Sequence, residues 1–231
     1  MYREDILLQN YQAVCSSLTQ AALSAKRNPR EITLLAVTKY APDEDVLTLL
    51  KHGVLTDVGE SRVQQAWKRW KEDPRFAAYT QVRKHFIGHL QTNKAAKAAQ
   101  LFDYVDSLDQ FQTAQALAKH LPPGKVLRAL VQVKLTDRQT QSGLPLLQAR
   151  QLAKQLQGAF ENIDVCGYMA VAPQGADAST LRALFKPLAQ AFQADFAHHP
   201  GAQLSLGMSE DFKIAVEEGS TLPRIGSLLF Q

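Results

Sequence analysis

Residues 32–72 of the chain read ITLLAVTKYAPDEDVLTLLKHGVLTDVGESRVQQAWKRWKE, and this stretch decides the fold class. ITLLAVTK (32–39) and LTDVGE (55–60) are short, largely apolar runs of the kind that forms buried strands. DEDVLTLLKHG (43–53) and SRVQQAWKRWKE (61–72) mix polar and apolar residues and predict helices. A strand followed by a helix, twice in succession, predicts a parallel sheet covered by helices.

The same alternation continues to the end of the chain. The pattern predicts further strands at 85–90, 104–109, 126–135, 163–171 and 203–208, and an eighth within TLPRIGSLLF (221–230). Eight strands that alternate with helices predict a (β/α)8 barrel, the TIM-barrel fold of the α/β class. An apolar stripe in residues 3–27 predicts an extra N-terminal helix. We see no linker or second unit, so we expect residues 1–231 to form one domain.

Composition and charge restrict the class of partner. Of the 231 residues, 45% are hydrophobic and 21% charged, and the formal net charge is only +4 with no block of like charges. We therefore expect no nucleic acid partner. No apolar run approaches the ~20 residues that span a bilayer, and no signal peptide is visible at the start. Because we interpret Cys15 and Cys166 as free thiols, we expect a cytoplasmic protein. A complete barrel without an exchanged arm favours a monomer.

In such barrels the chemistry lies at the carboxyl ends of the strands. Lys39 ends the first apolar run, where burial would favour the neutral amine, and a neutral amine can form a Schiff base. The alternative is a lysine whose ammonium group has already reached solvent at the strand end. The position of Lys39 alone favours that alternative.

The loops after the predicted seventh and eighth strands read SLGMS and RIGS. Barrels often bind phosphate with these two loops. Ser205, Ser209 and Ser227 would supply hydroxyl groups, and small residues such as Gly226 let the backbone approach an anion. The alternative is ordinary turn and cap chemistry. Both loops together favour a phosphate site, and a lysine amine with a phosphate site in one barrel mouth is what pyridoxal 5′-phosphate requires.

Several longer stretches resemble a known family, and they keep its order along the chain. They are LLAVTKYAP, VGESRVQQA, HFIGHLQTNK, LVQVKLTDRQTQSG, GYMAVAP and LSLGMSEDFKIAVEEGSTLPRIGSLLF. On these residues the chain resembles the pyridoxal phosphate homeostasis proteins (the YggS/PROSC family). The fold of that family is similar to the N-terminal barrel domain of alanine racemase.

The resemblance implies pyridoxal 5′-phosphate as the cofactor and a role for each cofactor-binding residue. Lys39 would form the Schiff base, Ser205, Ser209, Gly226 and Ser227 would hold the phosphate, and Arg224 would face the pyridine nitrogen. From the residues alone, a salt bridge at the barrel end is the better interpretation of Arg224. Without a carboxylate partner, the ring nitrogen would stay unprotonated, which weakens the cofactor as an electron sink.

Three positions depart from the family pattern. Ser61 stands where we expect asparagine, and Gln65 stands where a glutamate is usual, so a contact made by that asparagine is in doubt. Ser227 replaces a usual threonine and keeps the hydroxyl group.

The resemblance implies a protein that keeps pools of pyridoxal phosphate (vitamin B6) and amino acids in balance, with apo-enzymes as candidate acceptors. The similar racemases also use a tyrosine from a separate C-terminal β-domain, whereas this sequence ends at Gln231, so we expect no efficient catalysis and name no catalytic residue. A racemase or lyase of low activity and a barrel that serves only as an interaction scaffold remain alternatives. We expect no metal site, because the spacing of His85 and His89 loses its meaning in or beside a strand.

Overall fold

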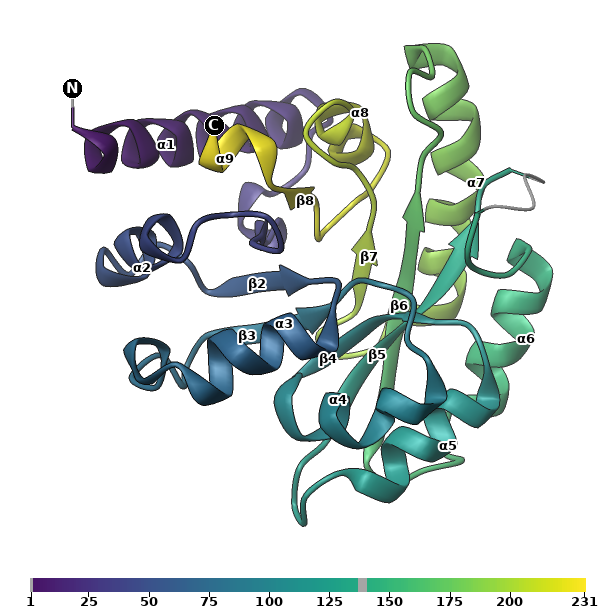
Figure 1. Cartoon of the computed structure of the whole chain (residues 1–231). Coiled ribbons are helices and arrows are strands. Elements are labelled where there is room, and N and C mark those ends of the chain that lie inside the picture. Colours follow the sequence, from purple (N-terminus) through teal and green to yellow (C-terminus); the bar gives the residue numbers. More distant parts are fainter. Residues whose placement is uncertain (1, 137–140) are drawn as a thin grey trace.

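The computed structural model describes residues 2–136 and 141–231, and strands and helices alternate along them (Figure 1). The strands are β1 (Leu35–Val37), β2 (Asp57–Glu60), β3 (Arg83–Phe86), β4 (Tyr104–Leu108), β5 (Leu127–Lys134), β6 (Ile163–Val171), β7 (Gln203–Ser205) and β8 (Arg224–Ile225).

The helices cover the outside of these strands. Those within the described residues are α1 (Arg3–Ser24), α2 (Asp43–Lys51), α3 (Val63–Trp67), α4 (Ala95–Leu101), α5 (Phe111–His120), α6 (Leu146–Leu156), α7 (Ala178–Phe196), α8 (Phe212–Glu217) and α9 (Ser227–Phe230). Short 3₁₀ turns lie at Pro29–Glu31, Pro74–Phe76 and Thr92–Lys94, and a π-helical segment at Lys68–Glu72 extends α3.

All paired strands run parallel, in the order β7-β6-β5-β4-β3-β2-β1-β8. No ladder joins β7 to β8 within the described chain. Backbone hydrogen bonds span this seam instead: the amide of Arg224 donates to the Gly207 carbonyl at 2.9 Å, and the amides of Thr221 and Leu222 donate to the Leu204 carbonyl at 2.9 and 3.1 Å. The barrel is therefore nearly closed, which confirms the predicted (β/α)8 fold, and its seam separates the two strands that carry the predicted phosphate loops.

The predicted bounds of a strand agree best with the observed bounds where the strand is long. β6 begins and ends at the predicted residues 163 and 171, whereas β1 covers only three residues of 32–39 and leaves Lys39 in the turn that follows. The eighth strand lies within the predicted residues 221–230, but its expected extent is wrong, because β8 has two residues and 227–230 form α9. There the amides of Leu229 and Phe230 donate to the Gly226 carbonyl, so the chain turns into a helix after Gly226.

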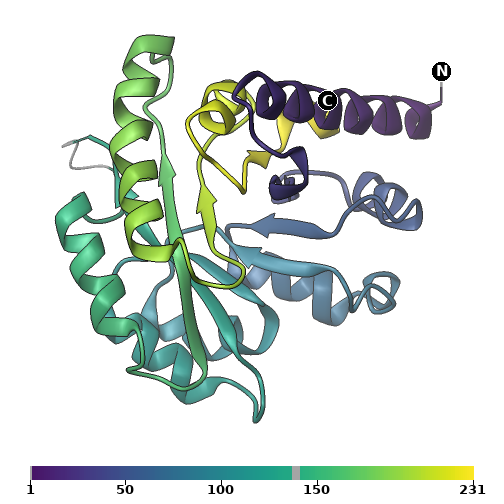
Figure 2. The same cartoon turned by 180° about the vertical axis from the view of Figure 1, so that it is seen from behind.

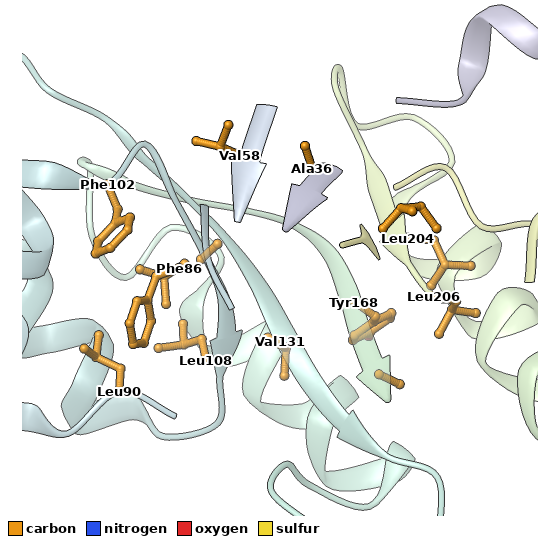
Figure 3. Packing of buried hydrophobic residues seen from close by; sticks show 14 of the residues in the cluster. Ala36, Val58, Phe86, Leu90, Phe102, Leu108, Val131, Tyr168, Leu204 and Leu206 are labelled. Atoms are coloured by element: carbon orange, nitrogen blue, oxygen red, sulfur yellow. The ribbon is translucent and has the colours of Figure 1, made fainter. Parts of the chain in front are cut away.

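Apolar side chains pack on both sides of the strands. The large cluster lies between the strands and the helices, where the rings of Phe86 and Phe102 are 5.1 Å apart (Figure 3). Strand residues alternate between the two faces of a sheet, so a second, smaller cluster fills the barrel interior. Its buried members come from five of the eight strands and their ends: Leu35, Tyr104, Leu130, Cys166, Met169 and Leu222.

The barrel interior also contains charged groups. Asp57, His85 and Asp106 are fully buried, and the His85 ring lies between the two carboxylates, with Nε2 3.1 Å from Asp57 Oδ1 and Nδ1 3.0 Å from Asp106 Oδ2. The Tyr104 ring stacks on His85 at 4.0 Å. Asp57 also accepts two hydrogen bonds from Arg83, each 2.7 Å long. Asp57, His85 and Asp106 thus form a charged layer inside the barrel, where such barrels usually carry branched apolar side chains.

The predicted N-terminal helix is present as α1, outside the barrel. It packs against α2, α8 and α9, and both views show it alongside α9 (Figures 1 and 2). The residues that α1 buries against them recur on one face of the helix: Leu7, Val14, Leu18, Ala21 and Ala22. None of the helices in the described part of the chain is long and apolar enough to cross a membrane.

Candidate functional site

A cavity of about 750 Å³ opens at the carboxyl ends of the strands. Its walls are the ends of β1, β6 and β8, the loops β1–α2, β6–α7 and β7–α8, and helix α9. This volume lies within the range of small-molecule pockets. Five of the six predicted cofactor residues line the cavity: Lys39, Ser209, Arg224, Gly226 and Ser227.

Lys39 lies in the turn between β1 and α2, two residues past the end of the strand. Its Nζ atom is 5.2 Å from the centroid of the Tyr40 ring, and the Tyr40 side chain is 77% exposed at the cavity mouth. Lys39 also lines a second cavity of about 580 Å³ on the α3 side of the turn. The amine therefore lies at the boundary of two cavities, next to an exposed aromatic ring.

The loops after β7 and β8 pack closely and present serine side chains to the cavity. Gly207 has a φ of +87°, and a Cβ atom there would lie 2.6 Å from the Cβ of Ala215, so only glycine fits. Gly226 approaches Val37 closely, because an added Cβ would lie 3.2 Å from the Val37 carbonyl oxygen. Between these close approaches, Ser209 and Ser227 line the same cavity. A small anion in the cavity would thus meet Ser209, Gly226 and Ser227.

Arg224 supplies a buried positive charge below this cavity, with 4% of its surface exposed. Nη1 donates to the carbonyl and the hydroxyl of Ser205, both at 2.8 Å, and Nη2 donates to the Ala170 carbonyl at 2.8 Å. Burial lowers the pKa of Arg224 to about 10, against the charges of Asp106 and Asp211. The guanidinium therefore stays protonated at neutral pH. No carboxylate of the described residues forms a salt bridge with it, unlike the barrel-end salt bridge that the residues alone favoured.

Ser205 is the one predicted cofactor residue that does not line the cavity. Its side chain is fully buried, and its hydroxyl donates to the Leu222 carbonyl at 2.9 Å while it accepts from Arg224. The structure thus shows Ser205 as a support of Arg224. A direct contact between Ser205 and phosphate stays a prediction.

Of the three departures from the family pattern, Ser227 lines this cavity, whereas Ser61 and Gln65 lie away from it. Ser61 lines a separate cavity of about 350 Å³ beyond β2, and Gln65 lies between that cavity and the one behind Lys39. His89 also lines the cavity at Ser61, whereas His85 is buried inside the barrel. Within residues 2–136 and 141–231, no group of three or more histidine, cysteine or acidic side chains could hold a metal ion.

Sequence reasoning missed a set of residues on the far side of Lys39. Glu60, at the end of β2, is 2% exposed and accepts hydrogen bonds from Arg69 and Trp70. Arg69 also reaches the backbone around Lys39. In the sequence, Arg69 and Trp70 belong to a charged helical run, KRWKE, with no local sign that they face inward.

The lining residues suit a small molecule that carries an aldehyde and a phosphate. The amine of Lys39 can bond covalently to an aldehyde, and the serine and glycine loops can hold an anion that the charge of Arg224 attracts. Gly207 and Gly226 let the two loops pack closely against Phe212, Ala215 and Val37, and Ser209 and Ser227 of these loops line the cavity.

No family model matches the chain, but individual proteins do. A pyridoxal phosphate homeostasis protein from Pasteurella multocida is 32% identical over 228 residues, which cover 96% of this chain and 95% of that protein. Among solved structures, PipY of Synechococcus elongatus PCC7942 with pyridoxal phosphate bound superposes with a TM-score of 0.77 and 29% identity, covering 93% of this chain and all of that one.

The fold is shared more widely. Alanine racemase from E. faecalis matches with a TM-score of 0.63 over 94% of this chain and 57% of the racemase, at 16% identity. That likeness shows the barrel architecture alone. The relative from Pasteurella multocida is similar along nearly the whole of both chains. The chain therefore belongs to the pyridoxal phosphate homeostasis protein family.

Proposed function

We propose that this protein binds pyridoxal 5′-phosphate in the 750 Å³ cavity, as a Schiff base with Lys39, and serves pyridoxal phosphate and amino-acid homeostasis without efficient catalysis. The observation that carries the proposal is that one cavity is lined by a lysine amine, a protonated buried arginine and two serine–glycine loops. The pyridoxal phosphate in the PipY structure and the name of the curated relative support the proposal.

Each residue has a distinct part in the proposed binding. Ser209, Gly226 and Ser227 hold the phosphate, and Arg224 faces the ring nitrogen with Ser205 behind it. Bound pyridoxal phosphate supplies an aldehyde and an electron-withdrawing ring. A protonated arginine can only donate a hydrogen bond and offers no acceptor to a protonated ring nitrogen, so the nitrogen stays unprotonated and the ring draws electrons weakly. The choice of arginine therefore favours holding the cofactor over chemistry on an amino acid.

Absorbance spectroscopy tests the covalent link. We expect a visible Schiff-base band when the purified protein is mixed with pyridoxal phosphate, and Lys39→Ala should abolish it. Lys68→Ala is the matched control, because Lys68 lines only the neighbouring cavity and should leave the band unchanged. A wild-type protein without the band, or a Lys39→Ala variant that keeps it, would refute the proposal.

Incubation with a panel of amino acids separates a carrier from a racemase or lyase. A carrier should show turnover far below the ~10 s⁻¹ that is the median for enzymes. Enzyme-like turnover of any amino acid would overturn the non-catalytic role. We further propose a cytoplasmic monomer that gives up its cofactor to apo-enzymes, and restored activity of an apo-enzyme acceptor measures that delivery.

A further inference from the structure

The turn that carries Lys39 is held from behind by one side chain. Arg69 Nη1 donates to the Thr38 carbonyl, and Nη2 donates to the Ala41 carbonyl, each at 2.9 Å. These carbonyls lie on either side of Lys39 and Tyr40, so a single planar guanidinium bridges the two ends of the turn. Arg69 Nε also donates to Asp43 Oδ1 at 2.6 Å, which ties the turn to the first residue of α2.

Glu60 fixes the orientation of this arginine. Its Oε1 atom accepts from Arg69 Nη1 and from Thr38 Oγ1, each at 2.8 Å, and from Trp70 Nε1 at 3.3 Å. Glu60 is 2% exposed, and the Arg69 side chain is 13% exposed. A buried pair of this kind carries a cost in desolvation, so its presence is weak evidence for a stabilising role alone.

The local helix geometry explains how two consecutive side chains reach one carboxylate. Arg69 and Trp70 lie in the π-helical segment Lys68–Glu72, which widens the turn after α3. Trp70 is buried and packs edge-on against Phe76 at 5.1 Å, which holds the segment in place. π-helical turns occur frequently at functional sites.

We propose that Arg69 is a positioning residue for Lys39, which sets the place and direction of the amine by holding both ends of its turn. This inference rests on the proposed role of Lys39 as the Schiff-base residue. Neither Arg69 nor Glu60 lines the cofactor cavity; both line the cavity behind the turn. Their effect on the cofactor therefore passes through the backbone of residues 38–41, because covalent bond formation requires close alignment of the reacting atoms.

The test separates bond formation from cofactor binding. The rate of appearance of the Schiff-base band reports the position of the amine. The affinity for pyridoxine 5′-phosphate, which has the ring and the phosphate but no aldehyde, reports the rest of the cavity. For Arg69→Gln we expect the band to form about 10- to 100-fold more slowly. The affinity for pyridoxine 5′-phosphate should stay unchanged.

Arg75→Gln is the matched control. Arg75 pairs with Asp43, Glu44 and Asp73 on the same surface, but it does not contact the turn of Lys39. It should form the Schiff base at the wild-type rate. Arg69→Lys keeps the charge but cannot bridge two carbonyls and Glu60 in one plane, so it should be slow as well.

Three outcomes would overturn the proposal. They are a wild-type rate in Arg69→Gln, a full rescue by Arg69→Lys, and an equal fall in pyridoxine 5′-phosphate affinity and in rate. If Arg69→Gln does not fold, Thr38→Val provides a second test, because it removes only the hydroxyl bonds to Glu60 and to the Gly59 carbonyl. It should still slow the appearance of the band, and a wild-type rate there also refutes the role. A wild-type protein that forms no band would instead refute the proposed function itself.

Discussion

Gly207 carries a structural constraint in the β7–α8 loop, two residues before Ser209 of the proposed phosphate site. A side chain there would have to adopt a φ of +87° and would meet Ala215 Cβ at 2.6 Å and Phe212 Cα at 2.8 Å. We expect Gly207→Ala to lower the free energy of unfolding by about 1–3 kcal/mol through backbone strain. The clash with Phe212 and Ala215 should add to this loss. The affinity for pyridoxal phosphate should also fall, since the loop must move. Urea denaturation and spectroscopic titration measure the two effects.

Gly53→Ala is the control for this prediction. Gly53 has a φ of +66°, but nothing lies within 4 Å of an added Cβ. This variant should show the cost of backbone strain without the clash. Equal destabilisation by the two substitutions would contradict the argument that Gly207 is required for close packing.

Ser227 and Ser205 should differ as alanine variants, because only Ser227 lines the cavity. Ser227→Ala loses a hydroxyl that can donate to a charged phosphate, a contact of about 1.5–3 kcal/mol, or roughly 10- to 150-fold in affinity. Ser205→Ala loses a support of Arg224 and should weaken binding of pyridoxal phosphate less. Titration of each variant with pyridoxal phosphate measures this. A larger loss for Ser205→Ala would place Ser205 in direct contact with phosphate.

At the scale of elements, Arg27 joins the end of α1 to the end of α8. Arg27 Nη1 donates to the carbonyls of Val216 at 2.5 Å and Ser220 at 2.8 Å, with only 17% of its side chain exposed. Burial lowers the pKa of Arg27, against the charge of Glu31. We expect Arg27→Gln to lower the free energy of unfolding by about 1–3 kcal/mol, because buried carbonyls lose a charged donor.

Denaturation by urea measures this change, and Arg30→Gln provides the control. Arg30 is exposed next to the same α1–β1 connection, and its loss should change stability by less than about 0.5 kcal/mol. If Arg27→Gln is equally harmless, α1 is held to α8 by its apolar face alone.

For the whole molecule, the buried layer of Asp57, His85 and Asp106 predicts how stability depends on pH. Burial lowers the pKa of His85, but the two carboxylates outweigh it and raise the pKa to about 9, from 6.5 in the unfolded chain. The stabilisation from His85 is complete below pH 6.5 and is lost as the pH rises to about 9. Burial raises the pKa of Asp57, but His85 and Arg83 lower it to about 2. Its stabilisation is present above pH 3.8 and is lost in more acidic solution.

We therefore expect the urea midpoint to be highest between about pH 4 and 6.5 and to fall towards pH 9. His85→Gln should remove the fall of the urea midpoint at alkaline pH. It should also lower the free energy of unfolding by about 3–5 kcal/mol, because it removes one partner of a buried charged network. The exposed His120→Gln should keep the wild-type profile. An unchanged alkaline slope in His85→Gln would show that His85 is not charged in the folded protein.

The sequence alone determined the barrel and most of the lining of the site. Burial on both faces of a parallel strand leaves a continuous apolar run, so 163–171 was predicted with its observed ends. The order of eight strands then placed Lys39 at the same barrel mouth as Ser209 and Ser227, because parallel strands end at one face of a barrel. The short β8 was less predictable, because a two-residue ladder depends on its neighbour β1.

Only the tertiary structure decided which polar residues lie inside. Glu60 meets Arg69 through a π-helical turn, and His85 meets Asp57 and Asp106 only when β2, β3 and β4 stand side by side. In the sequence these residues look like any charged residues of a soluble protein. Burying a charge is favourable only when its partner is held at bonding distance, and that distance is set by the packing of strands that are remote in sequence.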